Sequence, residues 1–201
     1  MWLVFLDLHL PKYPNSPSHE QPPETSHLVV PEVSSETRRF IPIGFLSPEI
    51  IASNKLQMIP GASLFHFGIM SSTMHMAWMR VVAGRLESRF SYAPAVYNNF
   101  PWAEVAAEQK EAVERAAQAV LEARSDFLPP TGRSTLADLY DPTAMPPALA
   151  KAHAELDREV EKCYRKEPFS SDRERVEFLF SLYEKLTAPL VTPTSRRSGP
   201  V

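Results

Sequence analysis

The second half of the sequence repeats apolar residues at helical spacing, and this feature limits the possible folds most strongly. After Pro101, apolar side chains recur every three or four residues, which places them on one face of an α-helix. The same spacing returns twice, the second time after Ser171-x-x-Glu174, the pattern of a capping box. The apolar positions are Val113, Ala116, Ala117, Val120 and Leu121, then Leu149, Ala152, Leu156, Val160 and Cys163, then Val176, Leu179, Phe180, Tyr183 and Leu186. Three such helices with short connections predict a small helical bundle over residues 103–190.

The first half differs, because its apolar segments are short and interrupted by proline. The chain contains 20 prolines, and residues 11–26 are expected to form an extended or disordered lead-in. Order is expected to begin near His27. Residues 27–33 and 38–46 predict short β-strands, and the proline in each suits an edge or irregular strand better than a central one.

The remaining elements of this half complete a mixed α+β pattern. Residues 61–70 predict another apolar strand, Ser47-Pro48-Glu49 predicts the start of a short helix, and residues 73–84 predict a helix capped by Ser71 or Ser72. The predicted class is therefore α+β, with a mixed small-sheet domain at residues 27–102 followed by a helical bundle. Residues 1–26 are the expected lead-in, and residues 191–201 are expected to be a disordered tail.

Charge and cysteine content narrow the class of protein only moderately. The net charge is -3, but residues 31–102 contain six Lys or Arg against four Asp or Glu, and residues 103–201 contain fourteen against seventeen. The first region is thus mildly basic, a weak indication of a polyanionic partner. The single cysteine, Cys163, excludes an internal disulfide and a multi-cysteine zinc site, which favours a reducing cytoplasm. The opening MWLVFLDLHL has no basic region and is too short to span a membrane, so neither a targeting signal nor a membrane partner is expected.

The common catalytic motifs are missing from the sequence. There is no phosphate-binding loop G-x-x-x-x-G-K-[ST], no G-x-G-x-x-G, no G-x-S-x-G and no H-E-x-x-H. His66 and His75 are flanked by Phe and Met, so we interpret them as core histidines rather than metal ligands. Glu108-Gln109-Lys110 lies on an amphipathic helix and is interpreted as a solvated face. No catalytic residue, metal ligand or cofactor-binding residue is assigned.

Residues 80–102, RVVAGRLESRFSYAPAVYNNFPW, combine three arginines and one glutamate with five aromatic residues. Arg85, Glu87 and Arg89 alternate along this segment. On an extended strand, residues two apart face the same way, so Glu87 and Arg89 would offer an acceptor and a forked donor side by side. Arg89 could then bind guanine O6 and N7 while Glu87 accepts from cytosine N4 of the same base pair. The alternative is a surface ion pair between the two residues that contributes little free energy.

Five segments in the same order closely resemble the C-terminal part of MmeI-like DNA methyltransferases, from about His27 to Leu190. These segments are RRFIPIGFLSPEIIASN, LFHFGIMSSTMHMAWMRVVAGRLESRFSY, VYNNFPW, LADLYDPTAMPPALAKAHAELDREVEKCY and RVEFLFSLYEKLTAPL. The family consists of bacterial restriction-modification enzymes with a nuclease, a helical connector, an adenine-N6 methyltransferase that uses S-adenosylmethionine, a target recognition domain and a helical C-terminal domain. The resemblance implies that residues 27–102 are the target recognition domain and that residues 103–190 are the C-terminal helical domain.

The catalytic parts of that family have no counterpart here. The N-P-P-Y or N-P-P-F motif that holds the flipped adenine is not found, and LPPT at residues 128–131 and NNFPW at residues 98–102 do not match it. The chain is therefore expected to be inactive alone, without a cofactor of its own, and to bind double-stranded DNA for an enzyme whose parent form uses S-adenosylmethionine. Two origins stay open, a truncated gene product and one half of a split system.

The resemblance also implies site residues. Base readout in the family lies around GRLESRFS at residues 84–91, and Glu87, Arg89 and Ser91 correspond to positions that differ between members with different targets. Lys55 matches a further readout position by spacing. Arg38, Arg39, Arg80 and Arg85 are candidate phosphate contacts or scaffold residues.

Two other functions remain as alternatives. One is a protein-interaction module that docks on a separate methyltransferase polypeptide, for which an exposed apolar patch at Tyr97, Phe100 and Trp102 is expected. The other is an independent enzyme of unknown type, which the missing catalytic motifs disfavour.

Overall fold

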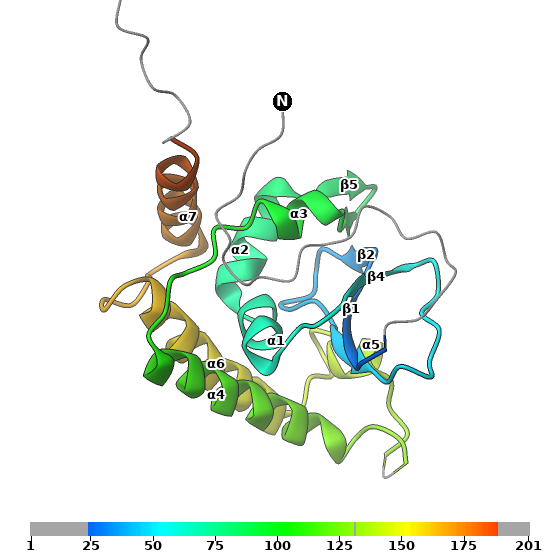
Figure 1. The fold of residues 1–201 in the computed structure, drawn as a ribbon. Helices are drawn as coiled ribbons and strands as arrows, with labels where there is room; N and C mark the ends of the chain where they lie inside the picture. Colours follow the sequence, from blue (N-terminus) through cyan, green and yellow to red (C-terminus); the bar gives the residue numbers. More distant parts are fainter. Residues whose placement is uncertain (1–23, 131, 189–201) are drawn as a thin grey trace, which may run out of the picture.

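The computed structural model describes residues 24–130 and 132–188, and in this part of the chain two small antiparallel sheets are combined with seven helices (Figure 1). The expected α+β class with a helical C-terminal region is confirmed. Most of the expected lead-in and the expected tail lie outside the described residues. The elements are β1 (His27–Pro31), β2 (Val33–Ser35), β3 (Gly44–Leu46), β4 (Leu56–Ile59), α1 (Leu64–Met70), α2 (Thr73–Val82), β5 (Gly84–Leu86), β6 (Arg89–Ser91), α3 (Pro94–Asn98), α4 (Ala107–Ser125), α5 (Leu136–Leu139), α6 (Pro147–Tyr164) and α7 (Asp172–Thr187).

The two sheets meet at a single residue between β1 and β2. The first sheet has the strand order β3-β1-β4 and the second has the order β2-β6-β5. Glu32 follows Pro31, which ends β1, and its backbone N–H donates to Lys55 O at 2.9 Å while its carbonyl accepts from Tyr92 N at 2.7 Å. Glu32 therefore connects the end of one sheet to the start of the other.

Two of the local predictions in the first half are wrong. The apolar run at residues 61–70 forms helix α1 rather than a strand. Ser63 caps this helix by accepting from Phe65 N, and His66 Nδ1 accepts from Ser63 N. Because six residues of α1 are buried, its apolar pattern is continuous and lacks the helical period. The expected helix after Ser47 is instead a turn, in which Ile50 N donates to Ser47 O.

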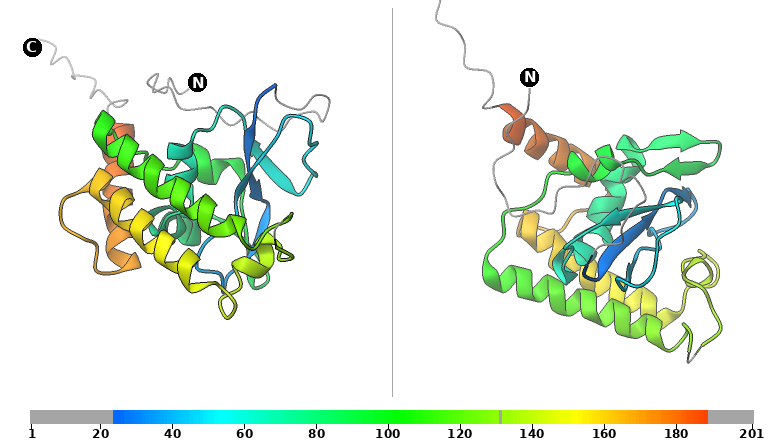
Figure 2. Two further views of the ribbon diagram at one scale, coloured as in Figure 1. Left: turned by 90° about the horizontal axis from the view of Figure 1, so that it is seen from below. Right: turned by 45° about the vertical axis from the view of Figure 1, so that its right-hand side comes forward.

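The predicted helices of the second half are present, and their packing joins them to the sheets. Helices α4 and α6 lie side by side, with α1 against α4, whereas α7 packs against α2 of the first half (Figures 1 and 2). At the α1–α4 crossing, a Cβ added to Gly68 would lie only 2.8 Å from Val113 Cγ1. One cluster of buried apolar residues runs from the strands through these helices.

A buried polar network fixes the helical part to the first sheet. The Arg124 side chain, at the end of α4, is 2% exposed; its Nη1 donates to Ile43 O at 2.8 Å, and its Nε donates to the Tyr140 hydroxyl at 2.8 Å. That hydroxyl in turn lies 2.7 Å from Nε2 of His153, whose ring stacks on Phe40. The guanidinium at the end of α4 thus donates a hydrogen bond to the buried carbonyl of Ile43, just before β3. Without a donor, a buried carbonyl would lower the stability of the fold.

Candidate nucleic-acid interface

The candidate site lies on the hairpin formed by β5 and β6, which extends away from the helices (Figure 2). Leu86 pairs with Arg89, so Glu87 and Ser88 form a two-residue turn. Glu87 has φ 55°, in the left-handed region where hairpin turns favour glycine. The expectation that Glu87 and Arg89 lie on one extended strand is therefore wrong, because the chain reverses between them.

The turn still brings the two side chains together. Arg89 Nη2 donates to Glu87 Oε2 at 2.9 Å, while the Glu87 side chain is 77% exposed and the Arg89 side chain 48% exposed. The ion pair considered as the alternative is thus present in the free chain. Since such an exposed pair contributes only about 0–1 kcal/mol, exchange of its partners for base edges costs little free energy.

Arg85 is held more firmly on the same hairpin. Its Nη1 donates to Glu36 Oε2 at 2.7 Å, and its guanidinium carbon lies 4.4 Å from the ring centroid of Phe90, which is buried. The Glu36 backbone N–H also donates to Ser88 O. Arg85 therefore braces the hairpin against the end of β2, which agrees with a scaffold role.

Lys55 and Ser91 lie toward the base of the hairpin. Ser91 ends β6 and pairs with Val33, the residue after Glu32. Lys55 is 74% exposed, and its Nζ lies 3.5 Å from Glu32 Oε2. The structure thus places Lys55 and Glu32 at the junction of the two sheets and Ser91 on the central strand β6, at the base of the hairpin that presents Glu87 and Arg89.

Sequence reasoning missed the acidic partners Glu32 and Glu36. A signal was present, because residues 31–102 contain only four acids, and three of them, Glu32, Glu36 and Glu87, form ion pairs with predicted site residues. Their partners could not be assigned without the strand pairing that brings them together.

The other three candidate phosphate contacts face the C-terminal helices. Arg38 Nη2 donates to Ala137 O at 3.4 Å, and Arg39 Nη2 lies 3.8 Å from Asp157 Oδ2 of α6. Arg80 forms an ion pair with Asp172 of α7. Each of these arginines therefore has a partner within the chain, away from the hairpin.

The expected apolar patch is absent at the predicted place. Tyr97, Phe100 and Trp102 are 2%, 3% and 8% exposed. Their rings pack edge to face with one another and with His66 and His75, which are buried as expected. These aromatic residues fill the core beneath the hairpin and offer no docking surface.

No group of three or more His, Cys, Asp or Glu side chains in residues 24–130 and 132–188 could hold a metal ion. No helix in the same part of the chain is long and apolar enough to cross a membrane.

Comparisons with known families decide the relationship of the chain. The family "MmeI, target recognition domain" matches residues 9–104, and "MmeI, C-terminal domain" matches residues 105–191. The chain belongs to the MmeI family. It comprises the target recognition and C-terminal domains of MmeI, and the match begins at residue 9, earlier than the expected start near His27.

Individual relatives agree with the MmeI assignment. DNA methyltransferase A of Bacillus subtilis (strain 168) is 41% identical over 161 residues, which are 80% of this chain and 18% of that protein. The structure of the Type IIL restriction-modification enzyme MmeI in complex with DNA matches at 47% identity and a TM-score of 0.78, over 84% of this chain and 22% of that one. The chain thus spans about a fifth of the length of these MmeI-type relatives.

Proposed function

We propose that this chain reads the sequence of double-stranded DNA through the β5–β6 hairpin and the adjoining junction of the two sheets. The observation that supports this most directly is the exposed pair of Glu87 and Arg89 at the hairpin tip, on a chain of the MmeI family. The relative of known structure was solved with DNA. A two-stranded ribbon also fits the width of the major groove.

The chemistry of the pair suits one G·C base pair. The Arg89 guanidinium donates two parallel hydrogen bonds to guanine O6 and N7, and the Glu87 carboxylate accepts from cytosine N4. Glu87 adopts a positive φ that costs a residue with a side chain about 1 kcal/mol. A glutamate at a position where glycine fits better is explained if its carboxylate has a role outside the fold.

A second donor and acceptor lie at the junction of the two sheets. Lys55 donates as a point charge and Glu32 accepts, and both are attached to the junction of the two sheets through the Glu32 N–H to Lys55 O hydrogen bond. Ser91 lies between this pair and the hairpin tip and can donate or accept. We assign base contacts to Lys55, Glu32 and Ser91 in addition to Glu87 and Arg89.

Methyl transfer is not proposed for the chain alone. The chain spans about a fifth of its relatives, and no cofactor residue is assigned in it. We propose that it acts with a separate methyltransferase polypeptide that carries the S-adenosylmethionine site. Such a polypeptide is the second proposed partner, after DNA.

Selection from random-sequence duplexes with the purified chain tests DNA recognition. We expect enrichment of a short motif that persists between about 50 and about 200 mM salt, because base contacts are less salt-dependent than phosphate contacts. The Glu87→Gln, Arg89→Gln double variant should lose preference at one position. The matched control, Arg173→Gln with Glu177→Gln, removes an exposed pair on α7 and should change nothing. Uniform binding to all duplexes would contradict the proposal.

A further inference from the structure

Helix α2 supports both strands of the readout hairpin. Only Ala83 separates its last residue, Val82, from β5. From the first turn of the helix, His75 Nε2 is hydrogen-bonded to the hydroxyl of Tyr92, which directly follows β6, at 3.0 Å. A tilt of α2 therefore moves the hairpin at both of its ends.

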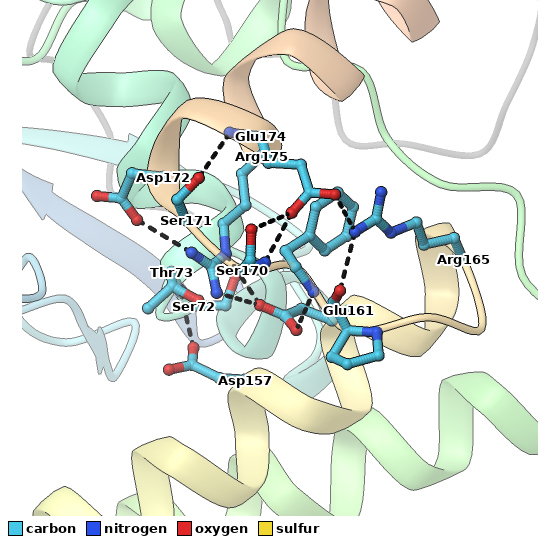
Figure 3. Close-up of polar contacts among 12 residues, drawn as sticks. Ser72, Thr73, Asp157, Glu161, Arg165, Ser170, Ser171, Asp172, Glu174 and Arg175 are labelled. Carbon is cyan, nitrogen blue, oxygen red and sulfur yellow. Dashed lines mark hydrogen bonds and ion pairs between the residues drawn. The ribbon is translucent and has the colours of Figure 1, made fainter.

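The N-terminus of α2 is anchored by the C-terminal domain. Thr73, the first helical residue, donates its backbone N–H to Asp157 Oδ1 of α6 at 2.7 Å (Figure 3). The Asp157 side chain is 11% exposed. A carboxylate at this end satisfies a free N–H group and interacts favourably with the helix dipole.

The C-terminal half of α2 is anchored by α7. Arg80 forms an ion pair with Asp172, and Trp78 packs against Phe180 and Tyr183 at ring-centroid distances of 5.1 and 5.9 Å. Asp172 also binds Arg175 at 3.1 Å.

Arg175 connects this anchor to the first one. Its Nε donates to Glu161 Oε1 at 2.9 Å, one helical turn from Asp157 on α6 (Figure 3). The ion pair of Arg175 with Glu161 therefore attaches the α7 anchor to α6, one helical turn from the residue that forms the first anchor.

We infer that Asp157 and Asp172 are positioning residues for DNA readout, which act from the C-terminal domain by fixing the direction of α2 and hence of the hairpin. The DNA part of this inference rests on the proposed function. Neither residue is on the hairpin, so base specificity depends on side chains that belong to a different domain.

The geometry makes the hairpin tip sensitive to these anchors. A ten-residue helix is about 15 Å long and a three-residue strand adds about 10 Å. A rotation of about 4° over that length displaces the tip by about 1.7 Å, which is enough to break a hydrogen bond that tolerates only a few tenths of an ångström.

The test combines two measurements on the full chain, amide hydrogen exchange without DNA and the affinity ratio between the selected duplex and a random one. Asp157→Ala and Asp172→Ala should speed exchange at residues 84–91 more than at β1. They should also lower the affinity ratio by about 2- to 30-fold, the usual range for coupling through packed elements. Asp157→Asn keeps an acceptor for the Thr73 N–H group, so its hairpin exchange and its affinity ratio should stay close to those of the wild-type chain.

Matched controls come from the same two helices. Among the described residues, Glu155 and Glu177 form ion pairs only along α6 and α7. Glu155→Ala and Glu177→Ala should therefore leave hairpin exchange and the affinity ratio unchanged. The inference would be overturned if amide hydrogen exchange of the hairpin were unchanged in both anchor variants. It would also be overturned if exchange rose equally at β1, α4 and the hairpin while the affinity ratio stayed the same. If the wild-type chain selects no DNA sequence, the proposed function fails. The positioning role is then decided by whether the anchor variants speed amide exchange in the hairpin more than at β1.

Discussion

Mild acid should destabilise this chain, because three histidines are buried in the neutral form. Burial lowers the pKa of His75 to about 3, and burial with a smaller effect of Arg124 lowers the pKa of His153 to about 3. Burial, with a smaller effect of Lys110, lowers the pKa of His66 to about 4. In the unfolded chain each pKa returns to about 6.5. The buried histidines therefore cost no stability well above pH 6.5, where both states are neutral, and they destabilise the folded chain as the pH falls below 6.5, because only the unfolded chain takes up protons.

The size of the loss follows from proton linkage. At pH 5 the unfolded chain binds nearly one extra proton per histidine, which removes about 2 kcal/mol each and about 6 kcal/mol together relative to pH 8. Asp157 acts in the opposite direction, because burial raises its pKa to about 6 and its folded form gains about 1.4 kcal/mol at pH 5. The net loss of about 4–5 kcal/mol is a large part of the about 5–15 kcal/mol by which native proteins are usually stable.

Urea unfolding at pH 8, 6.5 and 5 measures this loss. His66→Gln provides a sharp variant, since glutamine at this position can still accept from Ser63 N in a capping box but does not titrate. Its acid-induced loss should be smaller by about 2 kcal/mol, with little change at pH 8. An unfolding free energy that is equal at pH 8 and pH 5, or equal acid sensitivity of the variant, would refute the reasoning.

Three other outcomes are expected. Gly68→Ala should lower the unfolding free energy by about 1–3 kcal/mol in urea titrations, because its Cβ would lie 2.8 Å from Val113 Cγ1, and Val113→Ala in the same chain should recover part of the loss. Glu87→Gly should raise the unfolding free energy by up to about 1 kcal/mol by relieving the positive φ, yet weaken base preference in duplex selection; equal base preference would separate Glu87 from readout. The purified chain with labelled S-adenosylmethionine should transfer no methyl groups to DNA, and any transfer without a partner would contradict its assignment as a recognition module.

The sequence predicts the C-terminal helices well but not their partners. The apolar spacing around Val113, Leu156 and Leu179 identifies α4, α6 and α7, because each helix buries one face. The pattern shows which face is buried but not what covers it, so the packing of α7 on α2 could not be predicted. Helix α1 was mistaken for a strand because burial on nearly all sides removes the helical period.

The candidate site was only partly predictable for a related reason. Glu-Ser at the hairpin turn lacks the glycine or asparagine that marks most two-residue turns, so the reversal between Glu87 and Arg89 leaves no local signal. Glu32 and Glu36 enter the site through strand pairing between segments far apart in the sequence.

Exchange of the hairpin pair tests the central claim most directly. Glu87→Lys with Arg89→Asp would be introduced into this chain joined to the methyltransferase portion of an MmeI-family relative, and methylated sites would be mapped on a genomic template. The control exchanges the exposed α7 pair, Glu177→Lys with Arg173→Asp. Readout by the hairpin predicts that the preferred base changes at one target position, since each bidentate contact discriminates by about 1–3 kcal/mol, while the control keeps the original motif. An unchanged motif with unchanged activity in the hairpin variant would contradict the claim and leave Glu87 and Arg89 as a surface ion pair.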